Sequence, residues 1–215
     1  MGFLRTIGKI FAGFFILLGI TLFIISSLGS YAVKNINVLE RDVSSDEALD
    51  VLFKDSGINL QELKQDCAQN PNNENCQIFS KNPILGAIEK QINDFRYYGS
   101  MARSISIILF IMGLLLFVWC SGWIIGLRDV SLISFIGMLF SYLYFIIVIP
   151  AMLNKLLPEQ ILNIINNWVT VTTNQTLNLI LILSAIFLIL TVGLYILKYK
   201  MKPSKEASKK EQNGP

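Results

Sequence analysis

Long stretches without a charged residue are the dominant feature of this sequence. Four of them occur, at residues 10–33, 104–127, 130–154 and 160–197. An α-helix needs roughly 20 mainly apolar residues to cross the hydrocarbon core of a bilayer, so each stretch accommodates one crossing. We therefore expect an all-α integral membrane protein with four transmembrane helices. The predicted spans are residues 10–28, 104–126, 130–153 and 177–197.

The first apolar stretch has a second interpretation, as a cleaved signal peptide. Arg5 and Lys9 precede it, and Ser30-Tyr31-Ala32 fits a cleavage site. The apolar core of a signal peptide has ~7–15 residues, and this stretch is longer. We therefore favour an uncleaved first transmembrane helix, with residues 1–9 before it on the cytoplasmic side.

Residues 29–103 form the long polar segment between the first two spans, and three local signals in it predict helices. Ser44–Glu47 fits a capping box, and Asn59–Glu62 has a similar design. Asn82-Pro83 suits a helix start, because proline is tolerated in the first turn. No turn signal separates this third helix from the second span, so the two should be continuous. We expect a small helical ectodomain outside the membrane.

Cysteine chemistry in this chain is limited to one natural pair. There are three cysteines and no histidine. Cys120 lies within an apolar stretch, which leaves Cys67 and Cys76 to form a disulfide that ties the ectodomain. Closing so short a loop stabilises a fold by roughly 2–3 kcal/mol. The usual cysteine and histidine ligands of zinc cannot be assembled, and we expect no metal, no cofactor and no catalytic residue.

Four spans with cysteines in the first outer loop resemble the vitamin K epoxide reductase and disulfide-forming quinone oxidoreductase families. That resemblance implies a thiol–disulfide oxidoreductase that uses Cys67 and Cys76. Those families also carry a second cysteine pair that exchanges electrons with a quinone, and this sequence has no such pair. The architecture is also similar to that of claudin-like proteins, whose tryptophan and Gly-Leu-Trp signature is missing here. We therefore interpret Cys67–Cys76 as a structural disulfide.

Small residues predict how the second and third spans pack. The two glycines of the second span form a small-xxx-small motif, and the small residues of the third span line up on one face. Both patterns permit close approach of helices. These residues are Gly122, Gly126, Ser134, Gly137 and Ser141. We expect the two spans to form an antiparallel hairpin with a tight turn at residues 126–129.

Residues 154–176 are too few for a domain, and they fit an amphipathic helix. Asn163, Asn166 and Asn167 lie opposite an apolar face that includes Trp168. This pattern is typical of a helix in the membrane interface, with the tryptophan at headgroup level. After the last span, we expect residues 198–215 to form a disordered basic tail. Its candidate contacts with lipid headgroups are Lys198, Lys200, Lys202 and Lys205.

Positive charges near the spans predict the orientation. The N-terminus, the turn at residues 126–129 and the tail carry basic residues, whereas residues 154–176 carry only Lys155. Basic residues beside spans stay on the cytoplasmic side. Both termini are therefore expected in the cytoplasm, with residues 29–103 outside the plasma membrane, where disulfides persist.

By these boundaries no ionisable residue lies inside a span. Ionisable residues mark proton, ion and substrate pathways in membranes, so the pattern disfavours a proton-coupled transporter or a charge-selective pore. No basic patch with aromatic residues suggests nucleic acid. We expect a non-enzymatic protein of the lipid bilayer whose residues 29–103 meet a membrane-protein partner or a second copy. The alternatives are a thiol–disulfide oxidoreductase and a transporter or channel subunit.

Overall fold

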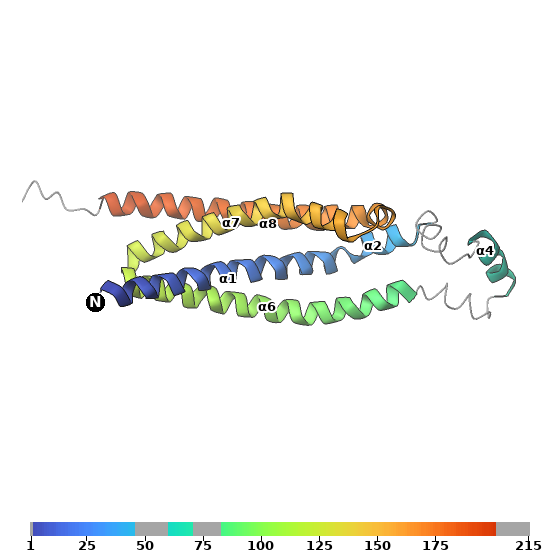
Figure 1. Ribbon diagram of the computed structural model, residues 1–215, viewed down its shortest axis with the longest axis horizontal. Coiled ribbons are helices and arrows are strands. Elements are labelled where there is room, and N and C mark those ends of the chain that lie inside the picture. Colours follow the sequence, from blue (N-terminus) through green and yellow to red (C-terminus); the bar gives the residue numbers. More distant parts are fainter. Residues whose placement is uncertain (1, 46–59, 71–82, 201–215) are drawn as a thin grey trace, which may run out of the picture. The chain divides into compact units, whose positions relative to one another are not determined.

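The computed structural model describes residues 2–45, 60–70 and 83–200, and all regular structure in these ranges is α-helical (Figure 1). The helices are α1 (Gly2–Lys34), α2 (Ile36–Val43), α4 (Leu60–Gln69), α6 (Pro83–Ser121), α7 (Trp123–Leu156) and α8 (Glu159–Lys200). Four of them, α1, α6, α7 and α8, are long and apolar enough to cross a membrane. The prediction of an all-helical chain with four helices able to cross a membrane is confirmed.

The chain divides into two compact units, and each of the four long helices contributes residues to both. Unit 1 comprises Met1–Phe23, Ser104–Tyr142 and Leu179–Pro215. Unit 2 comprises Ile24–Arg103 and Leu143–Asn178. Unit 1 thus contains the turn between α6 and α7, and unit 2 contains the long polar segment between α1 and α6.

α1 is the best-buried of the four long helices. In its most apolar stretch 39% is buried, against 22% for α6, 22% for α7 and 6% for α8. Within unit 1, glycines bring α6 against its backbone. A Cβ on Gly113 would lie 2.9 Å from the Ala12 carbonyl oxygen, and a Cβ on Gly19 would lie 2.9 Å from the Ser106 carbonyl oxygen. The contact therefore requires glycine at both positions.

α7 also packs on α1 in unit 1, through part of the predicted small face. A Cβ on Gly137 would lie 2.9 Å from the Leu17 side chain, and Ser134 is fully buried. The half-buried Ser141 donates its hydroxyl hydrogen to the Gly137 carbonyl oxygen at 2.9 Å, within α7. We had expected this face to hold α7 against the second span, but Gly137 contacts α1 instead.

The turn between α6 and α7 lies at Gly122, so the predicted turn at residues 126–129 is wrong. Gly122 has a φ of +83°, a conformation that glycine adopts without steric cost. Nothing lies within 4 Å of the place where its Cβ would be, whereas a Cβ on Gly126 would lie 2.7 Å from the Val118 Cα. Only the second glycine of the small-xxx-small motif therefore joins the two helices. The antiparallel hairpin itself is observed.

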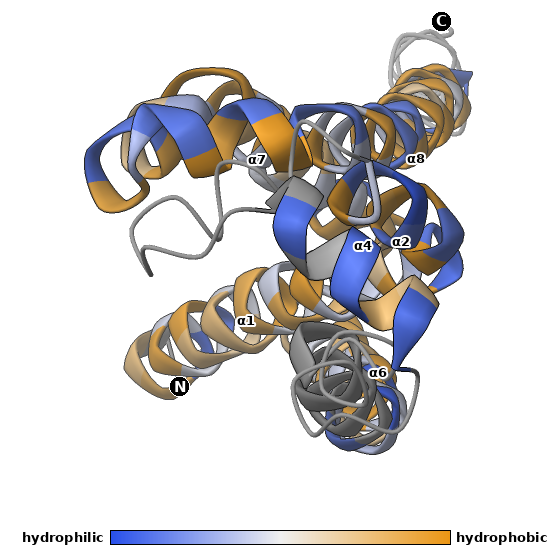
Figure 2. Ribbon diagram, turned by 90° about the vertical axis from the view of Figure 1, so that its right-hand side faces the viewer, coloured by the Kyte–Doolittle hydropathy of each residue, from blue (hydrophilic) through white to orange (hydrophobic). Residues whose placement is uncertain are grey.

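Side chains are distributed as in a protein surrounded by lipid. Several large apolar side chains are exposed, among them Ile189 at 70%. In the described part of the chain, the buried polar residues are small: Ser26, Ser27, Ser106, Ser131, Ser134, Thr172, Thr176 and Ser184. Helices in a bilayer pack through small residues and turn large apolar side chains toward lipid. Figure 2 shows that α1 is mainly hydrophobic and that α4 is mainly hydrophilic. The chain is thus compatible with an integral membrane protein.

In unit 2, hydrogen bonds join α1 to α6. The buried Ser26 donates to the Gly99 carbonyl oxygen at 2.8 Å, and Arg103 donates to the Ser30 hydroxyl oxygen at 3.1 Å.

α6 runs without a break from Pro83 to Ser121. The predicted continuity between the last helix of the polar segment and the second span is therefore confirmed.

The predicted interfacial segment at residues 154–176 is not a separate element. Residues 154–156 end α7, and α8 begins at Glu159 and continues to Lys200. The apolar stripe of its first turns is half-buried at Ile164, Ile165 and Trp168, and the three asparagines are exposed as expected. The amphipathic pattern was correct, but nothing interrupts the helix between this stripe and the fourth span.

Gly113→Ala is expected to lower the free energy of unfolding by about 1–3 kcal/mol, because the added methyl group would overlap α1. The measurement is thermal unfolding of the purified protein in detergent. Gly193→Ala is the matched control, since Gly193 lies inside α8 and nothing is within 4 Å of its added carbon. Equal melting temperatures of the two variants would contradict the close α1–α6 contact.

Candidate functional site

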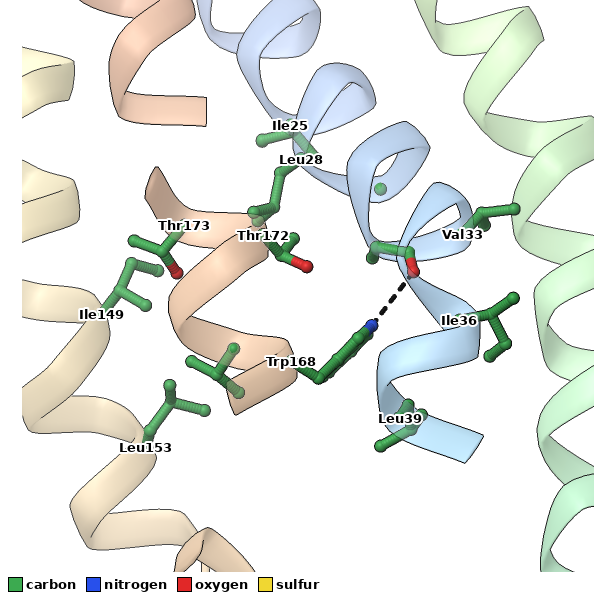
Figure 3. A pocket seen from close by; sticks show the side chains of 13 residues that line it. Ile25, Leu28, Val33, Ile36, Leu39, Ile149, Leu153, Trp168, Thr172 and Thr173 are labelled. Atoms are coloured by element: carbon green, nitrogen blue, oxygen red, sulfur yellow. Dashed lines mark hydrogen bonds between the residues drawn. The ribbon is translucent and has the colours of Figure 1, made fainter. Parts of the chain in front are cut away.

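Unit 2 contains an apolar pocket of about 500 Å³ between α1, α2, α7 and α8 (Figure 3). This volume falls within the roughly 300–1,000 Å³ of small-molecule sites. The lining residues are Ile25, Leu28, Gly29, Ala32 and Val33 of α1, Ile36 and Leu39 of α2, Ile149 and Leu153 of α7, and Trp168, Val169, Thr172 and Thr173 of α8. Only the last helix supplies polar side chains.

The end of α1 provides a polar contact inside this pocket. The last carbonyl groups of a helix have no partner within the helix, and α1 ends at Lys34. The Trp168 indole N–H donates to the Ala32 carbonyl oxygen at 3.1 Å, as the dashed line in Figure 3 shows. We had expected Trp168 to face lipid headgroups. Its indole instead points to α1, because α8 carries its apolar stripe against that helix.

Asn35 separates α1 from α2 and binds α8 through its side chain. Its amide donates to Gln175 Oε1 at 3.1 Å and to Thr172 Oγ1 at 3.4 Å. The Gln175 amide donates in return to Asn35 Oδ1 at 3.5 Å. These bonds satisfy polar groups beside the pocket wall and hold the helix break against α8.

The pocket offers apolar contact rather than reactive chemistry. Its lining contains no carboxylate, amine, imidazole or thiol. The indole N–H of Trp168 and the hydroxyl oxygen of Thr172 are already engaged in the bonds above. Such a lining can enclose an apolar group and supplies neither a general acid nor a general base. In the described part of the chain, no group of three or more His, Cys, Asp or Glu could hold a metal ion.

Unit 1 contains an ion pair that the sequence had placed in a turn. Arg128 and Asp129 lie inside α7, with Nη2 of the first 2.6 Å from Oδ1 of the second. Arg128 also lies over the Tyr195 ring of α8, 5.8 Å from its centroid. Both residues precede residue 130, where the predicted third span begins, so the expectation that no ionisable residue lies in a span stays a prediction. Pairing lowers the cost of desolvating both charges, and the long arginine side chain can reach an interface from this second turn.

The other predicted site residues are scattered rather than gathered into one site. Cys67 lies in α4 and is half-buried. Cys76 lies outside the described residues, so the disulfide stays a prediction. Lys198 and Lys200 end α8, while Lys202 and Lys205 also fall outside the described ranges.

The pocket was missed in the sequence, although its elements leave weak signals. Ile36, Leu39 and Val43 recur at helical spacing and form one face of α2. Trp168 and Thr172 share a face of α8 for the same reason. Neither pattern reveals that the two faces meet around an unfilled volume.

Comparison of the chain with protein-family models, curated proteins and solved structures found no match in any of the three.

Trp168→Phe is expected to lower the free energy of unfolding by about 1 kcal/mol, since the Ala32 carbonyl loses its donor. The measurement is again thermal unfolding in detergent. Trp119→Phe is the matched control, because Trp119 is 83% exposed. If both substitutions shift the melting temperature equally, the indole bond does not hold the end of α1.

Proposed function

We propose that this chain is a non-enzymatic integral membrane protein that presents a helical region outside the bilayer to a membrane-protein partner or a second copy. Helix length is the observation that carries the proposal. α6 has 39 residues and α8 has 42, which correspond to about 58 and 63 Å at a rise of about 1.5 Å per residue. The hydrocarbon core is only about 30 Å thick, so both helices extend well beyond it.

Exposed aromatic side chains support a membrane boundary on α6. Tyr97 is 67% exposed and Tyr98 is 64% exposed, and Trp119 lies near the other end of the helix at 83%. Tyrosine and tryptophan are enriched at both membrane interfaces. The rise from Tyr98 to Trp119 is about 32 Å, which matches one hydrocarbon core. With this placement, Asp94 and the preceding turns of α6 lie outside the membrane.

Basic residues support cytoplasmic termini. Arg5 and Lys9 lie near the start of α1, Arg128 lies near the start of α7, and Lys198 and Lys200 end α8. Four crossings bring these helix ends to the same side of the membrane. Lysine and arginine beside spans stay on the cytoplasmic side, and residues 29–103 are then outside the plasma membrane.

Within this outer region, we propose the Cys67–Cys76 disulfide as a structural link from α4 to the residues that follow it. Cys120 is a free thiol, and its sulfur lies 2.6 Å from the place where a Cβ on Gly8 would be. It therefore lies half-buried against α1 within unit 1. The remaining two cysteines form the natural pair, and no second pair exists in the sequence to relay electrons. This favours a structural disulfide over an oxidoreductase.

The orientation can be tested with an impermeant thiol reagent on intact cells that carry the Cys120→Ser variant. Cys67 and Cys76 are expected to react only after reduction, because the outer compartment keeps them oxidised. A variant with Lys205→Cys added, and with Cys67 and Cys76 changed to serine, is the control and should react only after lysis. Labelling of Cys67 and Cys76 only after lysis would reverse the orientation.

The interaction can be tested by site-specific photocrosslinking in native membranes. A photoreactive amino acid at Asp94 or Asn167, both exposed in unit 2, should give a discrete adduct with a protein or a second copy. The same amino acid at Ile189, which is 70% exposed on α8, is the control and should react mainly with lipid. Mass spectrometry identifies the adducts. If Asp94 and Asn167 give no protein adduct, the proposed interaction is contradicted.

A further inference from the structure

We propose that the pocket of unit 2 binds one acyl chain of a bilayer phospholipid. This inference concerns a ligand site and does not depend on a protein partner for residues 29–103. It rests on the chemistry of the pocket lining, on the place of that lining along the helices and on the size of the pocket.

The lining selects an apolar occupant. Its side chains are aliphatic apart from Trp168, Thr172 and Thr173. The Trp168 N–H is taken by the Ala32 carbonyl oxygen, and the Thr172 hydroxyl accepts from Asn35. A polar or charged ligand would lose its hydration here and could gain bonds only from the two threonine hydroxyl groups, which is costly. A hydrocarbon chain has no hydrogen bonds to water to lose, and its burial is favourable.

On two of the helices that form the lining, a long uncharged stretch ends at a lysine next to the pocket. On α1 the lining residue Val33 immediately precedes Lys34, and on α7 Leu153 lies shortly before Lys155. Both lysines are exposed, and both follow a stretch long and apolar enough to cross a membrane. The pocket therefore lies where an apolar span gives way to polar residues. This is the depth at which phospholipid chains join their headgroups, and the lysines provide cations for the phosphate.

The volume argues for an occupied pocket. The pocket is partly open, so molecules of the surroundings have access to its apolar lining. An unfilled apolar space of about 500 Å³ forfeits the van der Waals contacts of its lining. Water does not compensate, because it needs several polar partners. A phospholipid of the surrounding bilayer supplies a flexible chain of matching chemistry.

The test uses the full-length chain with Trp119→Phe and Trp123→Phe, which leaves Trp168 as the only tryptophan. A phospholipid with a dibrominated acyl chain is titrated into the protein in detergent, and the same lipid without bromine is the reference. Bromine quenches a tryptophan only at contact. We expect quenching that saturates near equimolar lipid, because one chain enters beside the indole.

Two substitutions on the same helix turn separate the pocket from the lipid-facing surface. Val169→Phe places a ring inside the pocket and should weaken the quenching by about tenfold, since steric exclusion acts directly on the chain. Val171→Phe is the matched control on the exposed face and should leave it unchanged. Thr173→Leu fills a smaller part of the pocket and replaces Val169→Phe if that variant does not fold.

Three outcomes would overturn the proposal. The first is quenching that rises linearly with lipid concentration, or quenching that is changed equally by Val169→Phe and by Val171→Phe. Either result would mean nonspecific contact with detergent and lipid. Saturation with a brominated free fatty acid, but not with the phospholipid, would assign the pocket to a different apolar ligand. A lipid-independent dimer in which Val169→Phe disrupts association would assign it to a second copy.

Discussion

The close contact between α1 and α6 is the constraint on which unit 1 depends. Lipid chains are as apolar as leucine, so the hydrophobic effect does not drive helices together inside a bilayer. Cohesion must come from van der Waals contact, which requires the backbones to approach closely. Gly19 and Gly113 allow this approach, and Gly137 lets α7 pack on the same helix beside Leu17. α1 is consequently the helix that the others cover, and large side chains elsewhere are left for lipid.

The break at Asn35 has a comparable role in unit 2. Where α1 ends, its last backbone carbonyl groups lose their hydrogen-bond partners within the helix. A carbonyl group without a partner costs about several kcal/mol in a lipid environment. The Trp168 indole makes such a bond to the Ala32 carbonyl oxygen, while the side chains of Asn35 and Gln175 bond each other across the break. Those bonds hold α8 at the helix break, and the pocket is the space left between these helices and α7. The polar groups that stabilise the break thus also define an apolar site.

Both roles proposed for this chain are binding roles. The pocket lining carries no titratable group, and the Arg128–Asp129 pair is neutralised within α7. The long helices offer exposed polar positions such as Asp94 and Asn167, while α8 exposes an apolar face. Protein contact through the polar positions and lipid contact through the pocket use different surfaces, so the two proposed interactions are compatible.

The sequence by itself determined the four apolar helices, the uninterrupted passage of α6 into its span and the amphipathic stripe of α8. Each of these follows from local patterns: charge-free length, the lack of a turn signal and helical periodicity. Tertiary structure decided the rest. Gly122 and Gly126 are alike in sequence, yet one makes a turn and the other a helix contact, because only packing chooses between them. The same holds for Trp168, whose pattern allows either lipid or protein as a neighbour. Its hydrogen bond to Ala32 depends on where α1 ends, and no pattern within α8 contains that information.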